Sequence, residues 1–185
     1  MSSEIKANSI QDKTGTRVLA SDSGSAWSWG TPPAGTVLQY LHFETSEDNA
    51  LTTSYVNYYE NAITLKSASS NVIVQCSMSV FIFENAGMGI KVYRKVGSGV
   101  ATSDTAVWTK NSDDGNPITL FMNVGGGEQA YIQQITGQDV ITGRSVGDVL
   151  YYGLFMRKRD GNNVNCPPNY AEDGFLTMDL IEVQK

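Results

Sequence analysis

A stretch of strict alternation between apolar and polar side chains lies in the first half of the chain. Every second residue from Val72 to Ile82 is apolar, and Gln75, Ser77 and Ser79 between them are polar. Because successive side chains of a strand point to opposite faces of its sheet, the pattern predicts a long, half-buried strand in an antiparallel sheet. The polar face ends in Phe81 and Phe83, which indicates that this end of the strand meets a second surface, such as a neighbouring subunit.

Shorter apolar runs, broken by Gly, Asn and Asp, recur from residue 36 to the end of the chain. None carries an apolar stripe of helical period, and the best helix candidate, residues 137–148, contains two glycines. The runs therefore predict an all-β domain, a sandwich or a barrel. The expected strands cover residues 37–43, 53–65 (one or two strands), 72–83, 88–95, 106–109, 118–124, 130–135, 150–159 and 175–183.

Residues 1–33 differ from the rest and predict an extended N-terminal arm. A short strand is expected at 17–20, with a turn at 21–25. Trp27 and Trp29 would share one side of an extended segment, and we expect both indoles to dock onto the domain or onto another chain. Pro32 and Pro33 hold the chain extended without pairing it, so they mark a boundary before a domain at 34–185.

Composition excludes several classes of protein. Charged residues make up 17% of the chain and its net charge is -6, which disfavours nucleic-acid binding because phosphate neutralisation needs clustered Lys and Arg. No run approaches the ~18 apolar residues of a membrane helix, and the N-terminus lacks the apolar core of a signal peptide. We therefore expect synthesis in a cytosol. Cys76 and Cys166 make no disulfide framework, and whether they pair stays open.

No catalytic set is evident, so we do not expect an enzyme. His42 is the only histidine, and a structural role is favoured over a Ser-His site. The acidic residues at 44–48 are read as a solvated turn. Oxygen-rich segments at 113–116 and 160–163 could bind calcium, but they are first of all turn formers. We expect no metal site and no cofactor, and leave calcium binding by these loops open.

Aromatic residues are the candidates for recognition. Tyr55, Tyr58 and Tyr59 stand beside Asn and Glu, and such tyrosines can stack on sugars and hydrogen-bond to them. Trp108 is a similar candidate. Ordinary strand packing or a subunit interface is the alternative for all four residues.

The order of several segments resembles the C-terminal head domain of tail fibres and related virion proteins of marine tailed phages, including cyanophages. Each segment is a weak signal alone, but together they are colinear and cover most of the chain. A linker-like segment that is similar to the one before such heads comes first. The segments are residues 5–16, 34–40, 52–55, 67–74, 151–157 and 176–183.

The resemblance implies a jelly-roll-like antiparallel β-sandwich, related to complement-type and tumour-necrosis-type trimers and exposed on a virion, without catalysis. It predicts a tail-fibre tip or short fibre that binds a host-surface receptor, with a bacterial surface glycan as the favoured class. Because the chain carries no repeat typical of a fibre shaft, a capsid decoration or neck protein that cements other virion subunits is the alternative. Which of these locations applies, and which virion protein the arm attaches to, stay open.

The same reading predicts a homotrimer with its arms together at the virion end. Phe81 and Phe83 lie opposite the apolar face of the long strand, and exposed phenylalanines of this kind mark an interface. A closed ring of subunits also hides sheet edges that would otherwise aggregate.

Overall fold

A computed structural model of the chain describes ten segments and places them in three antiparallel sheets without a helix. Within this described part, therefore, no helix is long and apolar enough to cross a membrane. The described residues are 9–11, 17–22, 26–29, 32–47, 49–83, 87–107, 118–121, 128–158, 164–166 and 174–185.

The described part of the predicted arm forms a small sheet. Strand β2 (Arg17–Asp22) pairs with both β1 (Ser9–Gln11) and β3 (Ala26–Trp29). The strand expected at 17–20 is confirmed, and it continues through Ser21 and Asp22, which were expected in a turn. Residues 23–25 of that expected turn lie outside the described residues. The sequence predicts the arm as extended and did not reveal that its segments pair with one another.

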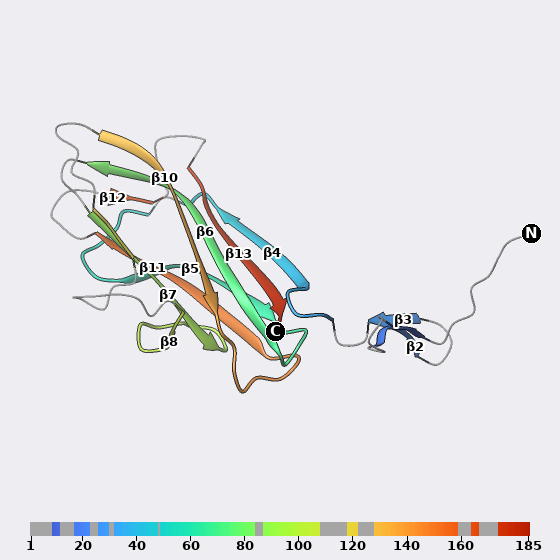
Figure 1. Ribbon diagram of the computed structural model, residues 1–185. Coiled ribbons are helices and arrows are strands. Elements are labelled where there is room, and N and C mark those ends of the chain that lie inside the picture. Colours follow the sequence, from blue (N-terminus) through green and yellow to red (C-terminus); the bar gives the residue numbers. More distant parts are fainter. Residues whose placement is uncertain are drawn as a thin grey trace, which may run out of the picture.

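The rest of the described chain forms a sandwich of two five-stranded sheets (Figure 1). The first sheet has the order β10-β6-β13-β4 with β12 paired to β6, and the second has the order β5-β11-β7-β8 with β9 paired to β7. The strands are β4 (Val37–Thr45), β5 (Val56–Thr64), β6 (Ser70–Phe83), β7 (Gly87–Val96), β8 (Thr105–Ala106), β9 (Ile118–Phe121), β10 (Glu128–Asp139), β11 (Val149–Lys158), β12 (Val164–Asn165) and β13 (Leu176–Gln184).

The chain changes sheet at most connections. It passes from β4 in the first sheet to β5 in the second, returns to β6, crosses again to β7, and later alternates through β10, β11 and β13. This wrapping of an antiparallel chain around two layers is the all-β sandwich that the strand pattern predicts, with the jelly-roll-like character that the family resemblance implies.

The core follows the alternation seen in the sequence. In β6, the residues at even positions from Val72 to Ile82 are buried, and those between them are only partly buried. Met88, Ile90 and Val92 of β7 point inward as expected and are fully or almost fully buried. The two inner faces thus supply one continuous apolar core, to which Leu150, Leu154, Met178 and Leu180 also belong.

Some element bounds differ from the expectation. Strand β10 extends to Asp139, so the first three residues of the helix candidate are strand, and residues 140–148 contain a turn but no helix. Strand β5 is a single strand rather than two. The two-residue strand β12, which pairs with β6 opposite Phe81 and Ile82, was not expected.

The two ends of the sandwich are distinct. We call the end at which residues 32–36 lead into β4 the junction end, and the C-terminus lies there as well (Figure 1). The Gly35 amide donates to the Gln184 carbonyl at 2.8 Å, and the Gln184 amide donates to the Thr36 carbonyl at 2.9 Å. Gly35 has a φ of 85°, which favours glycine at this turn.

Candidate functional site

The structure does not bring the three candidate tyrosines into one surface. Tyr58 and Tyr59 of β5 pack against the main core, whereas Tyr55, which precedes β5, packs against a separate apolar cluster. The register of β5 on β11 shifts between Leu154 and Phe155, which interrupts the regular alternation along β5. Trp108 lies outside the described residues.

Tyr58 and Tyr59 both contact the interior of the fold. The Tyr58 hydroxyl accepts a hydrogen bond from the Thr52 amide at 3.3 Å and donates to the Ala50 carbonyl at 3.4 Å, so it ties down the loop before β5. Burial raises the pKa of Tyr59.

Tyr55 lies in a different environment, in contact with two cations. The Lys91 Nζ atom is 4.5 Å from the centroid of the Tyr55 ring, and the Arg157 guanidinium carbon is 4.8 Å from it. Both distances are within the range of a cation–π contact. We call these three residues the Tyr55 site.

A glycine makes room for the Tyr55 ring. Gly89 of β7 is the cross-strand partner of Arg157 on β11. A methyl group at position 89 would lie 2.5 Å from the Tyr55 hydroxyl oxygen and 3.4 Å from the Arg157 Cγ atom. The absent side chain therefore lets the hydroxyl end of Tyr55 approach the second sheet closely.

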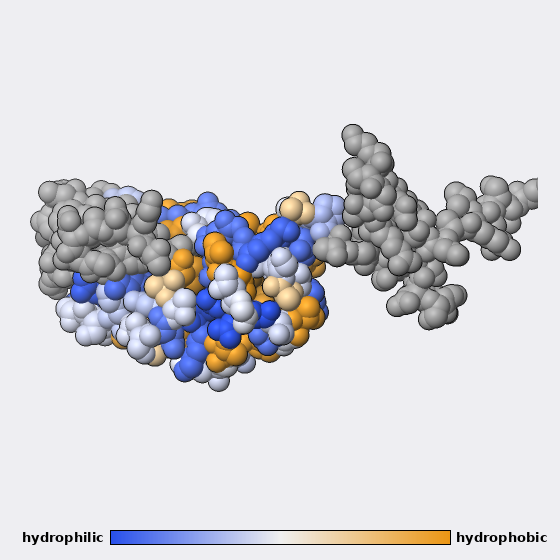
Figure 2. Space-filling model, turned by 60° about the horizontal axis from the view of Figure 1, so that its bottom comes forward, coloured by the Kyte–Doolittle hydropathy of each residue, from blue (hydrophilic) through white to orange (hydrophobic). Residues whose placement is uncertain are grey.

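The Tyr55 site borders a small apolar cluster on the outer face of the second sheet. Tyr93 and Phe155 meet edge to face with their ring centroids 5.2 Å apart, and Val100 belongs to the same cluster. Glu60 fixes the loop that carries Val100, since its carboxylate accepts from the amides of Gly99 and Val100 at 2.9 and 2.8 Å. Figure 2 shows hydrophilic and hydrophobic residues interspersed over the described part of the side that it presents.

A second polar cluster lies at the junction end around Glu182, which is fully buried. Its carboxylate accepts hydrogen bonds from the amides of Lys66 and Ser67, from the Ser70 hydroxyl at 2.7 Å and from the Gln39 side chain at 2.6 Å. We call these five residues the Glu182 cluster. The charged group is thus satisfied inside the fold by donors from β4, from the turn before β6 and from β6 itself.

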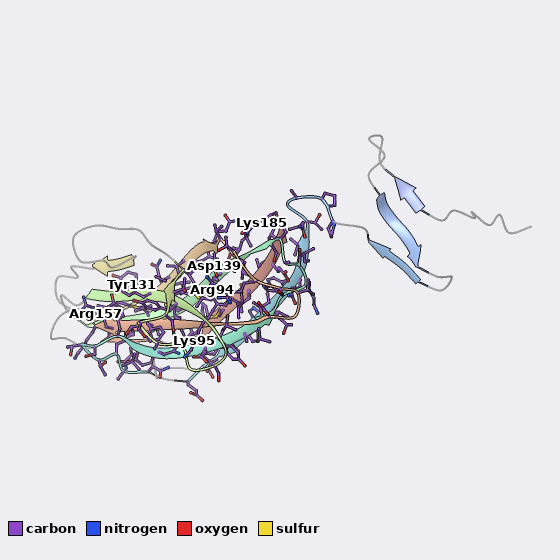
Figure 3. The ribbon with its side chains drawn as sticks, turned by 90° about the horizontal axis from the view of Figure 1, so that it is seen from below. Arg94, Lys95, Tyr131, Asp139, Arg157 and Lys185 are labelled. Atoms are coloured by element: carbon purple, nitrogen blue, oxygen red, sulfur yellow. The ribbon has the colours of Figure 1, made fainter. Side chains whose placement is uncertain are left out.

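The third cluster, also near the junction end, joins the two sheets. Arg94 of β7 and Asp139 of β10 form an ion pair with 2.7 Å between Nε and Oδ2, and the Tyr152 hydroxyl donates to the same oxygen at 2.8 Å. Figure 3 shows Arg94 and Asp139 side by side between the sheets. Burial raises the pKa of Asp139, while the positive charge of Arg94 acts in the opposite direction.

His42 takes part in a polar contact on the outer face of the first sheet. Its Nδ1 atom lies 2.6 Å from Asp179 Oδ1, and the Tyr40 hydroxyl donates to the same oxygen at 2.9 Å. This hydrogen bond to Asp179 raises the pKa of Tyr40. Through Asp179 the imidazole links β4 to β13.

Metal-ligating groups do not gather among the residues that the structure describes. The candidate loops 113–116 and 160–163 lie outside them, as does Asp48. Cys76 and Cys166 are both buried and unpaired, and burial raises the pKa of Cys166 to about 12. Neither thiol therefore has the character of a reactive nucleophile.

The predicted interface and docking residues are described only in part. Phe81 is half-buried, between the buried residues Val80 and Ile82, so it lies on the outer face of the first sheet as the alternation requires. Its cross-strand partners are Ala130 of β10 and Asn165 of β12. The side chains of Phe83, Trp27 and Trp29 lie outside what the structure describes.

The described surface carries two further exposed features. A hollow of about 370 Å³ at the junction end is lined by Pro32, Pro33, Thr36, Val37 and Leu38. The outer face of the first sheet also carries strongly exposed apolar side chains, Tyr40 at 56% and Ile132 at 74%. Sequence reasoning missed these two, because a single exposed apolar residue in a strand has no distinguishing pattern.

Comparisons with known proteins identify no family. No family model matches the chain, and no curated protein matches it. Among solved structures, one of the infectious bursal disease virus Gx strain is similar over 88% of this chain and 41% of the other, with 9% identity and a TM-score of 0.33. One of the Gt strain is similar over 91% and 50%, with 9% identity and a TM-score of 0.21. Scores of this size do not establish a shared fold.

Proposed function

We infer that the protein is a structural component of a phage virion, a tail-fibre tip or short fibre that binds a host-surface receptor and has no catalytic role. The observation that carries this inference is the Glu182 cluster. Three of the segments that resemble phage fibre heads meet in it: 34–40 through Gln39, 67–74 through Ser67 and Ser70, and 176–183 through Glu182 itself. Segments that are weak signals alone thus form one structural unit.

The arrangement of the two ends fits this role. The Glu182 cluster lies at the end of the sandwich where the N-terminal segment joins it. Its hydrogen bonds connect β4, β6 and β13 at that end. The Tyr55 site lies toward the opposite end, as Figure 3 shows by the separation of Arg157 from Lys185. A virion attached through its N-terminal arm would present that opposite end to the host.

Competition for adsorption tests the inference. The purified full chain, added in excess to host cells before the phage that encodes it, should occupy the receptor and slow adsorption in proportion to its concentration. A chain carrying Tyr55→Ala should compete less well if the candidate tyrosine contacts the receptor. Unchanged adsorption in saturating protein would contradict receptor binding.

A capsid decoration or neck protein is the second candidate. The exposed apolar residues of the first sheet favour it, since Tyr40 and Ile132 could equally bind neighbouring virion subunits. Copy number separates the two functions. A few copies at a vertex or tail support a fibre, whereas hundreds of copies over the shell support decoration.

A further inference from the structure

Two cations of an acidic protein meet at one aromatic ring, and neither has a carboxylate partner in the described structure. The chain has 13 basic and 19 acidic residues. The ion pairs among described residues join His42 to Glu44 and Asp179, and Arg94 to Asp139. None of them involves Lys91 or Arg157, which both lie over the Tyr55 ring.

The Glu60 carboxylate already has hydrogen-bond partners of its own. Glu60, on the same face of the second sheet, accepts from two loop amides and from the Asn57 amide nitrogen at 2.9 Å. The Arg157 Nε atom is itself buried without a hydrogen-bond partner in the described part of the chain. Buried polar groups are normally paired, and the fork of the same guanidinium carries further N–H donors that a ligand could engage.

The chemistry of these groups selects an oxyanion. A guanidinium binds carboxylate or sulfate oxygens through its fixed fork of donors, and an adjacent ammonium adds a second positive charge. The net charge of -6 repels polyanions from the molecule as a whole. Binding of an anionic ligand therefore requires a local site such as this one rather than general attraction.

The Tyr55 ring and Gly89 hold the two cations in place. Tyr55 lies close to the backbone at Gly89, and Arg157 extends across the same position from the neighbouring strand. The cations are thus positioned by strands β7 and β11 rather than by a loop, so little side-chain freedom is lost when a ligand binds.

We propose that the Tyr55 site binds an oxyanion carried by a saccharide of the host surface, the carboxylate of a uronic acid or a sulfate ester. This proposal rests on the receptor-binding function inferred above and names its ligand class. A carboxylate offers two oxygens in one plane and a sulfate ester offers three around a tetrahedral sulfur, and either group can accept hydrogen bonds from a guanidinium and an ammonium. Their relative affinity is an outcome of the test.

Calorimetric titration of the full chain with three saccharides tests the proposal. Alginate oligosaccharides carry carboxylates, dextran sulfate carries sulfates, and dextran is neutral. We expect at least one anionic saccharide to bind and dextran not to bind, with affinity falling as salt is raised to about 0.15 M. Lys91→Gln and Arg157→Gln should each weaken binding about tenfold, a loss of about 1.4 kcal/mol.

Lys95→Gln is the matched control. Lys95 lies on β7 two positions beyond Tyr93, and its ammonium donates to the Gly99 carbonyl rather than contacting Tyr55. The same charge change there should alter affinity less than twofold. Because Arg157→Gln could impair folding, Arg157→Lys serves as a second variant, and it should weaken binding while keeping the charge.

Three results would overturn the proposal: no binding of either anionic saccharide, binding that Lys95→Gln weakens as much as Lys91→Gln, or wild-type affinity in both Tyr55-site variants. The adsorption experiment separates its failure from that of the function. If variants at Lys91 and Arg157 still compete fully for adsorption, the Tyr55 site is not the receptor contact, and the receptor-binding function is unaffected. If the wild-type chain binds the saccharide but does not compete for phage adsorption, the receptor-binding function is contradicted instead.

Discussion

At the scale of single residues, two carboxylates of this protein hold neighbouring segments in place by hydrogen bonds. Glu182 receives donors from two loop amides and two side chains, and Glu60 holds the loop before Val100 in the same manner. The buried Glu182 carboxylate would be costly if its oxygens were not paired, and the partly buried Glu60 carboxylate orders its loop through the same kind of hydrogen bond.

Replacing Glu182 with Gln should destabilise the protein strongly. The new amide nitrogen would face donors, so at least two hydrogen bonds to a charged acceptor would be lost. We expect a loss of about 3 kcal/mol in the free energy of unfolding, measured by urea denaturation. Glu44→Gln, at an exposed residue, is the control and should cost less than about 0.5 kcal/mol. Equal stability of the two variants would mean that the Glu182 cluster does not brace the junction end.

At the same scale, the close approach at Gly89 predicts a coupled pair. Gly89→Ala places a methyl group against the Tyr55 hydroxyl and should cost about 1–3 kcal/mol. In a chain that already carries Tyr55→Ala the same change should cost little, because the clash is gone. A double-mutant cycle on unfolding free energies measures this coupling. Additive effects of the two substitutions would show that Tyr55 does not lie over Gly89.

At the scale of elements, the sequence predicted the strands better than their partners. The alternation in β6 was sufficient to place its buried face, because the period of two is set by the backbone alone. The strands β1 and β12 were missed since they contain two or three residues and carry no periodic pattern.

The candidate site was less predictable than the fold. Tyr55, Tyr58 and Tyr59 are neighbours in the sequence, but a register shift in β5 and the start of the strand at Val56 direct them to different clusters. Lys91 and Arg157 are brought to Tyr55 by pairing between β7 and β11, which connects residues far apart in the chain. No local pattern in the sequence carries that information.

The ion pair between Arg94 and Asp139 links β7 to β10. It predicts that the stability lost on replacing Arg94 depends on pH. Because burial raises the pKa of Asp139 in the folded state, this carboxyl group's contribution to stability is fully present below its unfolded pKa of about 4 and is lost as the pH rises through the folded value. Removing Arg94 raises that folded pKa further. The cost of Arg94→Met should therefore be greater at pH 7 than at pH 4, by about 1.4 kcal/mol for each unit of added shift.

Denaturation of the wild type and of Arg94→Met at both pH values measures this difference. Lys95→Met removes a positive charge from the next residue of β7, where the ammonium donates to a loop carbonyl, and its cost should not change with pH. A cost of Arg94→Met that is independent of pH would contradict the assignment of the buried charge to Asp139.

At the scale of the whole molecule, we propose a homotrimer built on the outer face of the first sheet. Light scattering should give about three times the chain mass of 20.1 kDa. Phe81→Asp, and Ile132→Asp at the strongly exposed position of β10, should release monomers or aggregates because each buries an unpaired charge in the interface. Val146→Asp, in an exposed loop, should leave the trimer intact. A wild-type monomer at micromolar concentration would exclude the trimer.

Location on the particle decides the proposed function most directly. Antibodies against the purified chain, applied with gold labels to intact phage particles, show where it lies and in how many copies. The proposed fibre role requires label at the tail or at fibre tips, in small numbers per particle, and label spread over the shell would favour decoration instead. A complete absence of the chain from purified particles would contradict a virion protein of either kind.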